Sequence, residues 1–179
     1  VNAGAKFIVS PGLNPTVVKY CVDKGIPVTP GTSNPSDVEM AISLGLDVVK
    51  FFPAEQAGGI NMIKAMAAPY TQMKFMPTGG ISAQNAAEYL ALPNVLCCGG
   101  SWMVPGGLLD AGDFDAIEAL AREAAQIVQN EKQDKAHLKT LCPVFFIYGC
   151  GVGKSPAYRA RINSPLSFIP FGSDTFVTF

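Results

Sequence analysis

The sequence predicts an α/β fold with a parallel sheet, and three observations indicate it. A short apolar segment, a turn of small residues and an amphipathic helical segment recur about every twenty residues. Strands that alternate with helices in this way form right-handed βαβ units. Glycines and prolines gather at the C-terminal ends of the apolar segments, where the closed form of such units has its active site. We therefore expect the (β/α)8 TIM barrel.

The composition excludes several classes of protein. The 179 residues are 49% hydrophobic and 15% charged, which is typical of a globular domain and not of a disordered chain. A net charge of −1 creates no field that would attract nucleic acid or an anionic membrane. The five cysteines show no CxxC spacing and there is one histidine, so we expect no zinc site and reduced, mostly buried thiols in the cytoplasm.

Five apolar segments are predicted as strands, each followed by a turn. They are Lys6–Ser10, Ile26–Thr29, Val48–Phe52, Lys74–Met76 and Val95–Cys98. A barrel has eight strands, so the sequence predicts about the last five βα units of one. We expect the remaining strands to precede Val1.

The predicted helices begin at recognisable capping residues. Asn14 stands before Pro15, and a polar side chain followed by proline at the first helical position favours a helix N-terminus. The other predicted starts are Ser33 or Asn34 before Pro35, the pair Gly58–Gly59, and Ser82 for a helix that runs to about Leu90, followed by a last helix over about 115–130.

Lys50 interrupts an otherwise apolar strand. A lysine is almost never fully buried unless something pairs with it or uses it. Burial lowers the pKa of the amine, and a neutral amine can attack a carbonyl to form a Schiff base. Alternation places Val48, Lys50 and Phe52 on one face of the strand, which is the interior in a barrel. The alternative is a lysine whose stem crosses the core while its head reaches water, and the barrel geometry favours the Schiff base.

Two glycine-rich turns follow the last two predicted strands, at Thr78–Ser82 and Gly99–Ser101. Glycine lets backbone N–H groups approach an anion, and barrels often bind phosphate in the loops after their last strands. We interpret these turns as a phosphate site, with tight turns that need glycine as the alternative. Glu55 is the carboxylate nearest to Lys50 in sequence, and we expect it to have a surface or turn-capping role.

Four motifs resemble, in order and spacing, the class I 2-keto-3-deoxy-6-phosphogluconate / 4-hydroxy-2-oxoglutarate aldolase family. These motifs are Ser10–Leu13, Val49–Glu55, Pro77–Ser82 and Gly99–Trp102. The resemblance covers about residues 1–130, as the C-terminal part of the aldolase barrel, and leaves 131–179 as a tail outside it.

The resemblance implies a cytoplasmic lyase of the Entner–Doudoroff pathway, without metal or cofactor and usually a homotrimer. Such an enzyme cleaves 2-keto-3-deoxy-6-phosphogluconate to pyruvate and glyceraldehyde 3-phosphate, and is expected to act also on 4-hydroxy-2-oxoglutarate. Lys50 matches the catalytic lysine that forms the Schiff base. The implied substrate-binding residues are Pro11 and Phe52 beside the imine, Thr78 where substrate choice is influenced, and Gly79, Gly80 and Ser101 at the phosphate end.

Three further residues of the family pattern would lie before Val1. They are the catalytic glutamate, the arginine for the substrate carboxylate and the threonine of a Gly-Ala-Gly-Thr turn. We therefore expect this chain alone to be inactive or nearly so in aldol cleavage. The alternative function is a non-catalytic phosphosugar-binding or assembly half-barrel. The sequence leaves open the preference between phosphorylated and unphosphorylated keto acids.

The tail over 131–179 has three open interpretations. It is a family-specific extension, a segment that takes the place of absent strands, or sequence that is not a natural continuation. Val144–Tyr148 is apolar enough to add one strand. Gly149–Ser155 is similar to a phosphate-binding loop but lacks its spacing, so we expect no nucleotide site there.

Overall fold

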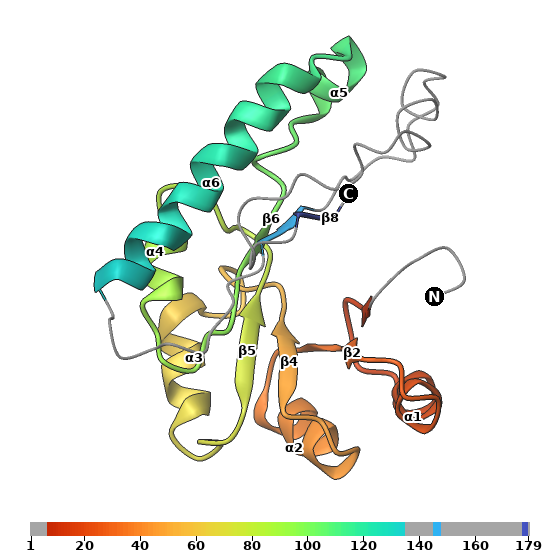
Figure 1. The fold of residues 1–179 in the computed structure, drawn as a ribbon. Coiled ribbons are helices and arrows are strands. Elements are labelled where there is room, and N and C mark those ends of the chain that lie inside the picture. The colour runs from red at the N-terminus through yellow and green to blue at the C-terminus, as the bar shows by residue number, and fades with distance from the viewer. Residues whose placement is uncertain (1–6, 135–144, 148–176, 179) are drawn as a thin grey trace. The chain divides into compact units, whose positions relative to one another are not determined.

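The structure, a computed structural model, describes residues 7–134, 145–147 and 177–178. It is drawn in Figure 1 and comprises two compact units, Val1–Gly80 and Ile81–Phe179, which are described separately here. Among the described helices, none combines the length and the apolar character needed to cross a membrane.

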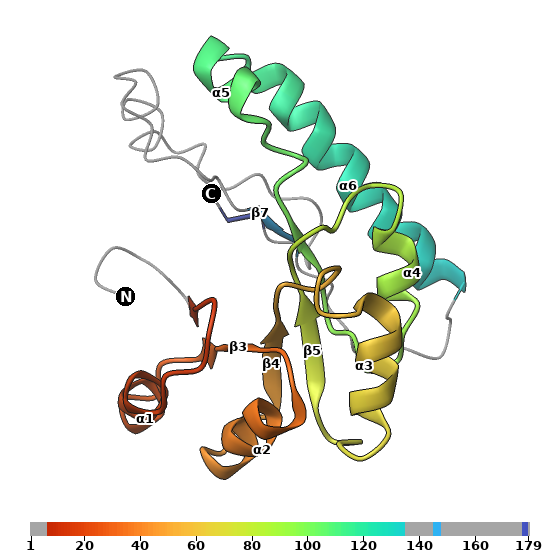
Figure 2. The same ribbon diagram turned by 180° about the vertical axis from the view of Figure 1, so that it is seen from behind.

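Every strand pair of the first unit is parallel, as the sequence predicts. One pair joins β1 (Ile8–Val9) to β2 (Val28–Thr29). A second group has the order β3 (Gly31–Thr32), β4 (Val48–Phe51) and β5 (Lys74–Pro77). Figures 1 and 2 both show β4 and β5 side by side. In this register β4 is the central strand, with Lys50 opposite Gly31 on one side and Met76 on the other.

Three helices belong to the first unit: α1 (Pro15–Asp23), α2 (Pro35–Ser43) and α3 (Gly59–Ala67). The predicted cap of α1 is confirmed, because the Asn14 Oδ1 accepts hydrogen bonds from the Thr16 N–H at 3.0 Å and the Val17 N–H at 3.3 Å. Gly58 stands at the N-cap of α3, also as predicted. The position at which a helix begins depends on capping residues that are close in sequence, and for this reason the sequence alone predicts it.

At the start of α2 the structure selects Asn34 over Ser33. The Asn34 Oδ1 accepts a hydrogen bond from the Asp37 N–H at 3.0 Å, while the Asp37 carboxylate accepts one from the Ser33 N–H at 2.8 Å. Two side chains thus satisfy reciprocal donors at one helix end. We expect Asn34→Ala to lower the free energy of unfolding by about 1 kcal/mol. Ser36→Ala, an exposed position in the same helix, is the control for urea unfolding, and an equal loss there would contradict capping as the cause.

The core of the first unit contains both faces of β4 and β5. Val49, Phe51 and Phe75 are fully buried on these strands, and α3 contributes Ile63 and Met66. A smaller apolar cluster lies between α1 and the first strand pair, with Val18, Cys21 and Val28 at its centre. Burial on both faces explains why β4 is almost continuously apolar in sequence.

The described residues of the second unit form three helices and a second parallel sheet. The helices are α4 (Ala86–Leu90), α5 (Gly106–Ala111) and α6 (Phe114–Asp134). The strands, in spatial order, are β6 (Gly99–Gly100), β7 (Phe145–Ile147) and β8 (Val177–Thr178). A buried apolar face runs along α6, which packs against α4 and α5 (Figure 1).

Two predictions for the second unit are wrong in detail. Within the predicted strand Val95–Cys98, Val95 forms only an isolated bridge and the next three residues belong to no strand, whereas Gly99 and Gly100 are paired in β6. Val95, Cys97 and Cys98 are buried and Leu96 is half-buried. Apolar patterning reports burial, whereas pairing depends on where the neighbouring strand lies. Ser82 is not the cap of α4: Asn85 holds that position, and its Oδ1 accepts a hydrogen bond from the Ser82 N–H at 2.8 Å.

The tail is described only in part. The apolar run predicted to add a strand does so as β7, which pairs in parallel with β6, whereas α5 and β8 were not predicted. Gly149–Ser155 lies outside the described residues, and the division of the chain near residue 130 stays a prediction. In the described part of the chain, Cys21, Cys97 and Cys98 are buried, and burial raises the pKa of the Cys98 thiol.

Candidate active site around Lys50

Lys50 is buried in the central strand of its sheet, with 4% of its surface exposed. Its Nζ lies 4.4 Å from the centroid of the Phe52 ring. Burial lowers the pKa of the Lys50 amine below its ordinary value of 10.5, because loss of solvation disfavours the charged form. The amine therefore has more of the neutral form, which can attack a carbonyl, than an exposed lysine would have.

The backbone around Lys50 is held by β3. The Lys50 N–H donates to the Pro30 carbonyl at 2.9 Å, and the Phe52 N–H donates to the Thr32 carbonyl at 3.1 Å. The Thr32 hydroxyl, itself 1% exposed, donates to the Lys50 carbonyl at 3.1 Å. Sequence reasoning did not single out Thr32. A polar residue just after a Pro-Gly turn, at a buried strand position, is the signal that could have identified it.

Pro11 contacts β3, the strand that pairs with the strand of Lys50. A Cβ atom built on Gly31 would lie 1.9 Å from the Pro11 carbonyl oxygen, so the two backbones are in direct contact. Gly31 is also the residue opposite Lys50 in the parallel register. Pro11 therefore lies beside the strand that pairs with the strand of Lys50, and its role in the pocket stays a prediction.

Thr78 follows β5 and is 3% exposed. Its backbone joins the two loops, since its N–H donates to the Phe51 carbonyl at 3.0 Å and its carbonyl accepts from the Ala54 N–H at 2.8 Å. Its Oγ1 is buried, and among the described residues it has no hydrogen-bond partner. Buried hydroxyls usually have a partner, and this one directly follows the strand that pairs with β4, the strand of Lys50.

Gly79 and Gly80 form a turn that no other residue could adopt without strain. Their φ angles are +94° and +80°, in the left-handed region that favours glycine. A Cβ on Gly79 would lie 3.2 Å from the Pro53 Cα and 3.3 Å from the Phe52 Cδ2. A Cβ on Gly80 would lie 2.5 Å from the Cγ of Glu55, which is exposed as expected. The loop after β4 and the turn after β5 are therefore packed against each other.

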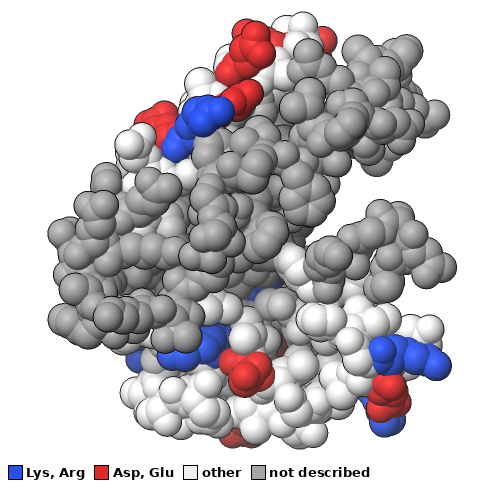
Figure 3. Space-filling model, viewed as in Figure 1, with Lys and Arg blue, Asp and Glu red and all other residues white. Residues whose placement is uncertain are grey.

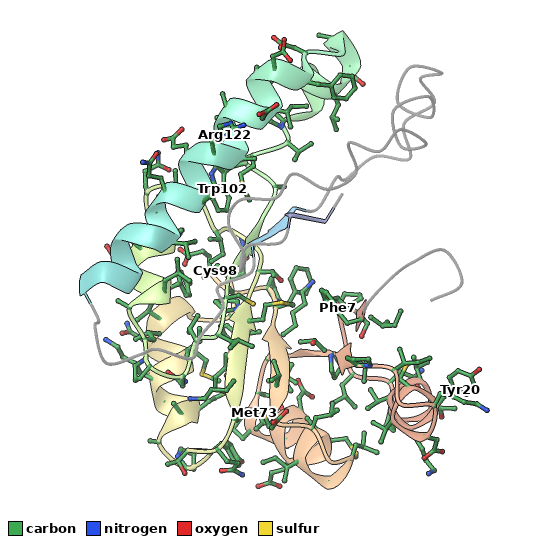
Figure 4. All side chains as sticks on the ribbon, in the orientation of Figure 1. Phe7, Tyr20, Met73, Cys98, Trp102 and Arg122 are labelled. Carbon is green, nitrogen blue, oxygen red and sulfur yellow. The ribbon has the colours of Figure 1, made fainter. Side chains whose placement is uncertain are left out.

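Ser101 lies in the second unit, whereas the other predicted site residues all lie in the first. It is exposed and follows β6, and its carbonyl accepts a hydrogen bond from the Val104 N–H at 3.0 Å. The neighbouring Gly100 lies against the indole ring of Trp102, because a Cβ there would be 1.9 Å from the Trp102 Cζ3. Figure 4 labels Trp102 and Cys98, which flank this strand.

The charged side chains of the described residues are mixed in sign on the face that Figure 3 draws. On the face drawn in Figure 3, basic side chains lie beside acidic ones instead of gathering in one patch. Two exposed ion pairs within helices, Lys19–Asp23 and Glu118–Arg122, contribute to this mixture. An anionic substrate would therefore be recognised by local groups at the site and not by a long-range field.

The family model for KDPG and KHG aldolase matches residues 1–120. The chain belongs to the KDPG and KHG aldolase family. Among curated relatives, a 2-dehydro-3-deoxy-phosphogluconate aldolase of Treponema pallidum is 53% identical over 126 residues, which are 70% of this chain and 60% of that protein. The chain thus spans about 60% of the length of this relative.

Solved structures of KDPG aldolases share the same fold. A Zymomonas mobilis 2-keto-3-deoxy-6-phosphogluconate aldolase with 3-phosphoglycerate matches with a TM-score of 0.64 and 46% identity, over 69% of this chain and 57% of that one. A Legionella pneumophila KDPG aldolase, with pyruvate captured as a covalent carbinolamine intermediate, matches with a TM-score of 0.64 and 42% identity, over 66% and 58%. KDPG aldolases are TIM-barrel α/β proteins, so the predicted fold class is confirmed at that level.

The buried amine makes the stability of this aldolase-family chain depend on pH. Between the lowered folded-state pKa of Lys50 and 10.5, the unfolded chain binds more protons than the folded chain. Stability contributed by Lys50 therefore rises as the pH rises through that window. We expect Lys50→Met to be more stable than the wild-type chain near neutral pH, and this difference to narrow as the pH approaches 10.5. Urea unfolding at several pH values measures it, and a pH-independent difference would contradict it.

Proposed function

We propose that this chain contains the imine-forming centre of a class I aldolase. The enzyme would cleave 2-keto-3-deoxy-6-phosphogluconate to pyruvate and glyceraldehyde 3-phosphate, and would also act on 4-hydroxy-2-oxoglutarate. The observation that carries the proposal is the Lys50 amine, buried at the C-terminal end of a parallel strand with a lowered pKa. The pyruvate carbinolamine named for the Legionella pneumophila relative supports the same chemistry.

The proposed reaction begins with attack of the neutral Lys50 amine on the keto carbon of the substrate. The carbinolamine that forms loses water and becomes an imine, whose protonated form withdraws electrons from the adjacent carbon. A base then takes the proton of the substrate's C4 hydroxyl, a role that the family resemblance gives to the catalytic glutamate. The bond between C3 and C4 breaks, the aldehyde leaves, and the electron pair remains as an enamine on Lys50. Protonation of the enamine and addition of water release pyruvate and restore the amine.

The substrate-binding roles are those that the family resemblance implies, and the positions of Phe52 and Pro11 near Lys50 support them. Phe52 would cover the imine, since its ring already lies against the Lys50 Nζ, and Pro11 would border the pocket. The buried Thr78 hydroxyl would bind a polar group of the substrate. The family resemblance assigns contacts with the phosphate end to Gly79, to Gly80 and to Ser101.

The finer architecture is part of the proposal. The chain would comprise about the last five βα units of the barrel over residues 1–130, with 131–179 as a separate tail. The intact enzyme would be a cytoplasmic homotrimer. These features follow from the family resemblance of the four motifs.

Borohydride trapping with pyruvate tests the proposed function. We expect a covalent adduct that peptide mapping assigns to Lys50. No adduct, with binding of a phosphate ester retained, would instead favour the non-catalytic phosphosugar-binding or assembly half-barrel. Cleavage of 2-keto-3-deoxy-6-phosphogluconate by this chain is expected to be slow or absent, and a rate like that of a full-length relative would contradict that expectation.

A further inference from the structure

We propose that Glu55 is a positioning residue for the phosphate end of the substrate. The methylene groups of the Glu55 side chain would hold the Gly79–Gly80 turn in the conformation that contacts phosphate. This inference rests on the proposed function, because it takes that turn as the phosphate contact.

The side chain of Glu55 occupies the space that a side chain on Gly80 would need. A Cβ on Gly80 would lie 2.5 Å from the Glu55 Cγ and 2.7 Å from the Glu55 Cβ. The methylene groups of Glu55 are therefore packed directly on the Gly80 backbone. Long charged side chains often cover a neighbouring surface with their stems while the charged head stays in water.

The backbone of Glu55 contacts the other glycine of the turn. The Glu55 N–H donates to the Gly79 carbonyl at 3.1 Å, next to the 2.8 Å hydrogen bond from the Ala54 N–H to the Thr78 carbonyl. One residue thus touches both left-handed glycines, by a hydrogen bond and by packing. Successive glycines have the largest conformational freedom of any backbone, so a group that restricts them reduces the entropy lost on binding.

Packing, and not charge, is the expected basis of the effect. Glu55 is exposed, so water and salt screen its carboxylate. Pyruvate forms the imine with Lys50 but carries no phosphate group, so it would make no contact with the Gly79–Gly80 turn. Loss of the Glu55 stem should therefore weaken binding of phosphate esters and leave imine formation with pyruvate unchanged.

The test compares Glu55→Ala, which removes the stem, with Glu55→Gln, which keeps it and removes the charge. Binding of 3-phosphoglycerate is measured by calorimetry, and pyruvate adduct formation at Lys50 by borohydride trapping. We expect Glu55→Ala to bind 3-phosphoglycerate about fivefold to tenfold more weakly than the wild-type chain, and Glu55→Gln to bind within about twofold of it. All three should form the pyruvate adduct at the same rate. Asn61→Ala, at an exposed residue of α3 outside this loop, is the control and should bind as the wild type does.

Amide hydrogen exchange separates positioning from general unfolding. In Glu55→Ala, exchange of the Gly79 and Gly80 amides should become faster while exchange in β4 stays as in the wild type. Equal 3-phosphoglycerate binding by Glu55→Ala and wild type would overturn the inference, as would equal losses in Glu55→Ala and Glu55→Gln. A wild-type chain that forms the adduct but does not bind 3-phosphoglycerate overturns the inference and leaves the imine proposal standing. If the Glu55 variants bind 3-phosphoglycerate as expected but no chain forms the pyruvate adduct, the imine proposal alone is overturned.

Discussion

Lys50→Met is expected to abolish the pyruvate adduct that borohydride traps, with a loss of about a thousandfold or more in adduct yield. Methionine is close to lysine in length and suits an apolar site, so the substitution removes the nucleophile with little change in packing. The substitution removes the amine and replaces one methylene group of the stem with sulfur. Mass spectrometry of the trapped chain, followed by peptide mapping, measures the result.

Two further variants show whether the nucleophile itself is responsible. Lys64→Met makes the same chemical change at an exposed position of α3 and should leave the adduct unchanged. Lys50→Arg retains a cation but offers no neutral amine, because the guanidinium stays protonated, and it should also lose the adduct. An adduct that persists in Lys50→Met, or that maps to another lysine, would contradict the Schiff-base assignment.

Gly31→Ala is expected to have the largest effect on stability, a loss of about 2–4 kcal/mol in the free energy of unfolding. The added Cβ would lie 1.9 Å from the Pro11 carbonyl oxygen, 2.4 Å from the Pro11 carbonyl carbon and 2.9 Å from the Gly12 nitrogen. All three atoms belong to the backbone, so no side-chain rotation can relieve the overlap. The loop after β1, which contains Pro11, must therefore move away from β3. Because Gly31 of β3 lies opposite Lys50, this movement disturbs the packing beside the strand of Lys50.

Gly12→Ala is the matched control for this variant. It lies in the same loop, and an added Cβ would meet no atom within 4 Å. Its free energy of unfolding should stay within about 0.5 kcal/mol of the wild type. Urea unfolding of both variants makes the comparison. Equal stabilities of Gly31→Ala and Gly12→Ala would mean that the approach of Pro11 to Gly31 is not as close as the structure shows.

The features that sequence analysis predicted correctly depend on neighbours in the chain. Asn14 caps α1 through hydrogen bonds to residues two and three positions away. Lys50 is buried in a strand because the residues around it are apolar, and its amine lies on Phe52 because alternate residues of a strand share a face. Such features need only local spacing and side-chain chemistry.

Predictions that depended on a distant partner were less accurate. Most of the apolar residues Val95–Cys98 are buried as expected, yet β6 forms at Gly99–Gly100, where β7 lies alongside. Ser82 and Asn85 both suit a helix start, and the turn that precedes α4 selects Asn85. In each case several local solutions were available, and the surrounding structure selected one of them.

The sequence by itself determined the parallel α/β organisation, the buried lysine and the glycine-rich turns, together with the family to which these motifs belong. Only the tertiary structure decided that Thr32 holds the Lys50 backbone, that Pro11 contacts Gly31 and that Glu55 packs on Gly80. The physical reason is that the strand register brings together segments that are far apart in the chain. A side chain's identity shows what chemistry it can perform, but the register decides which groups it meets.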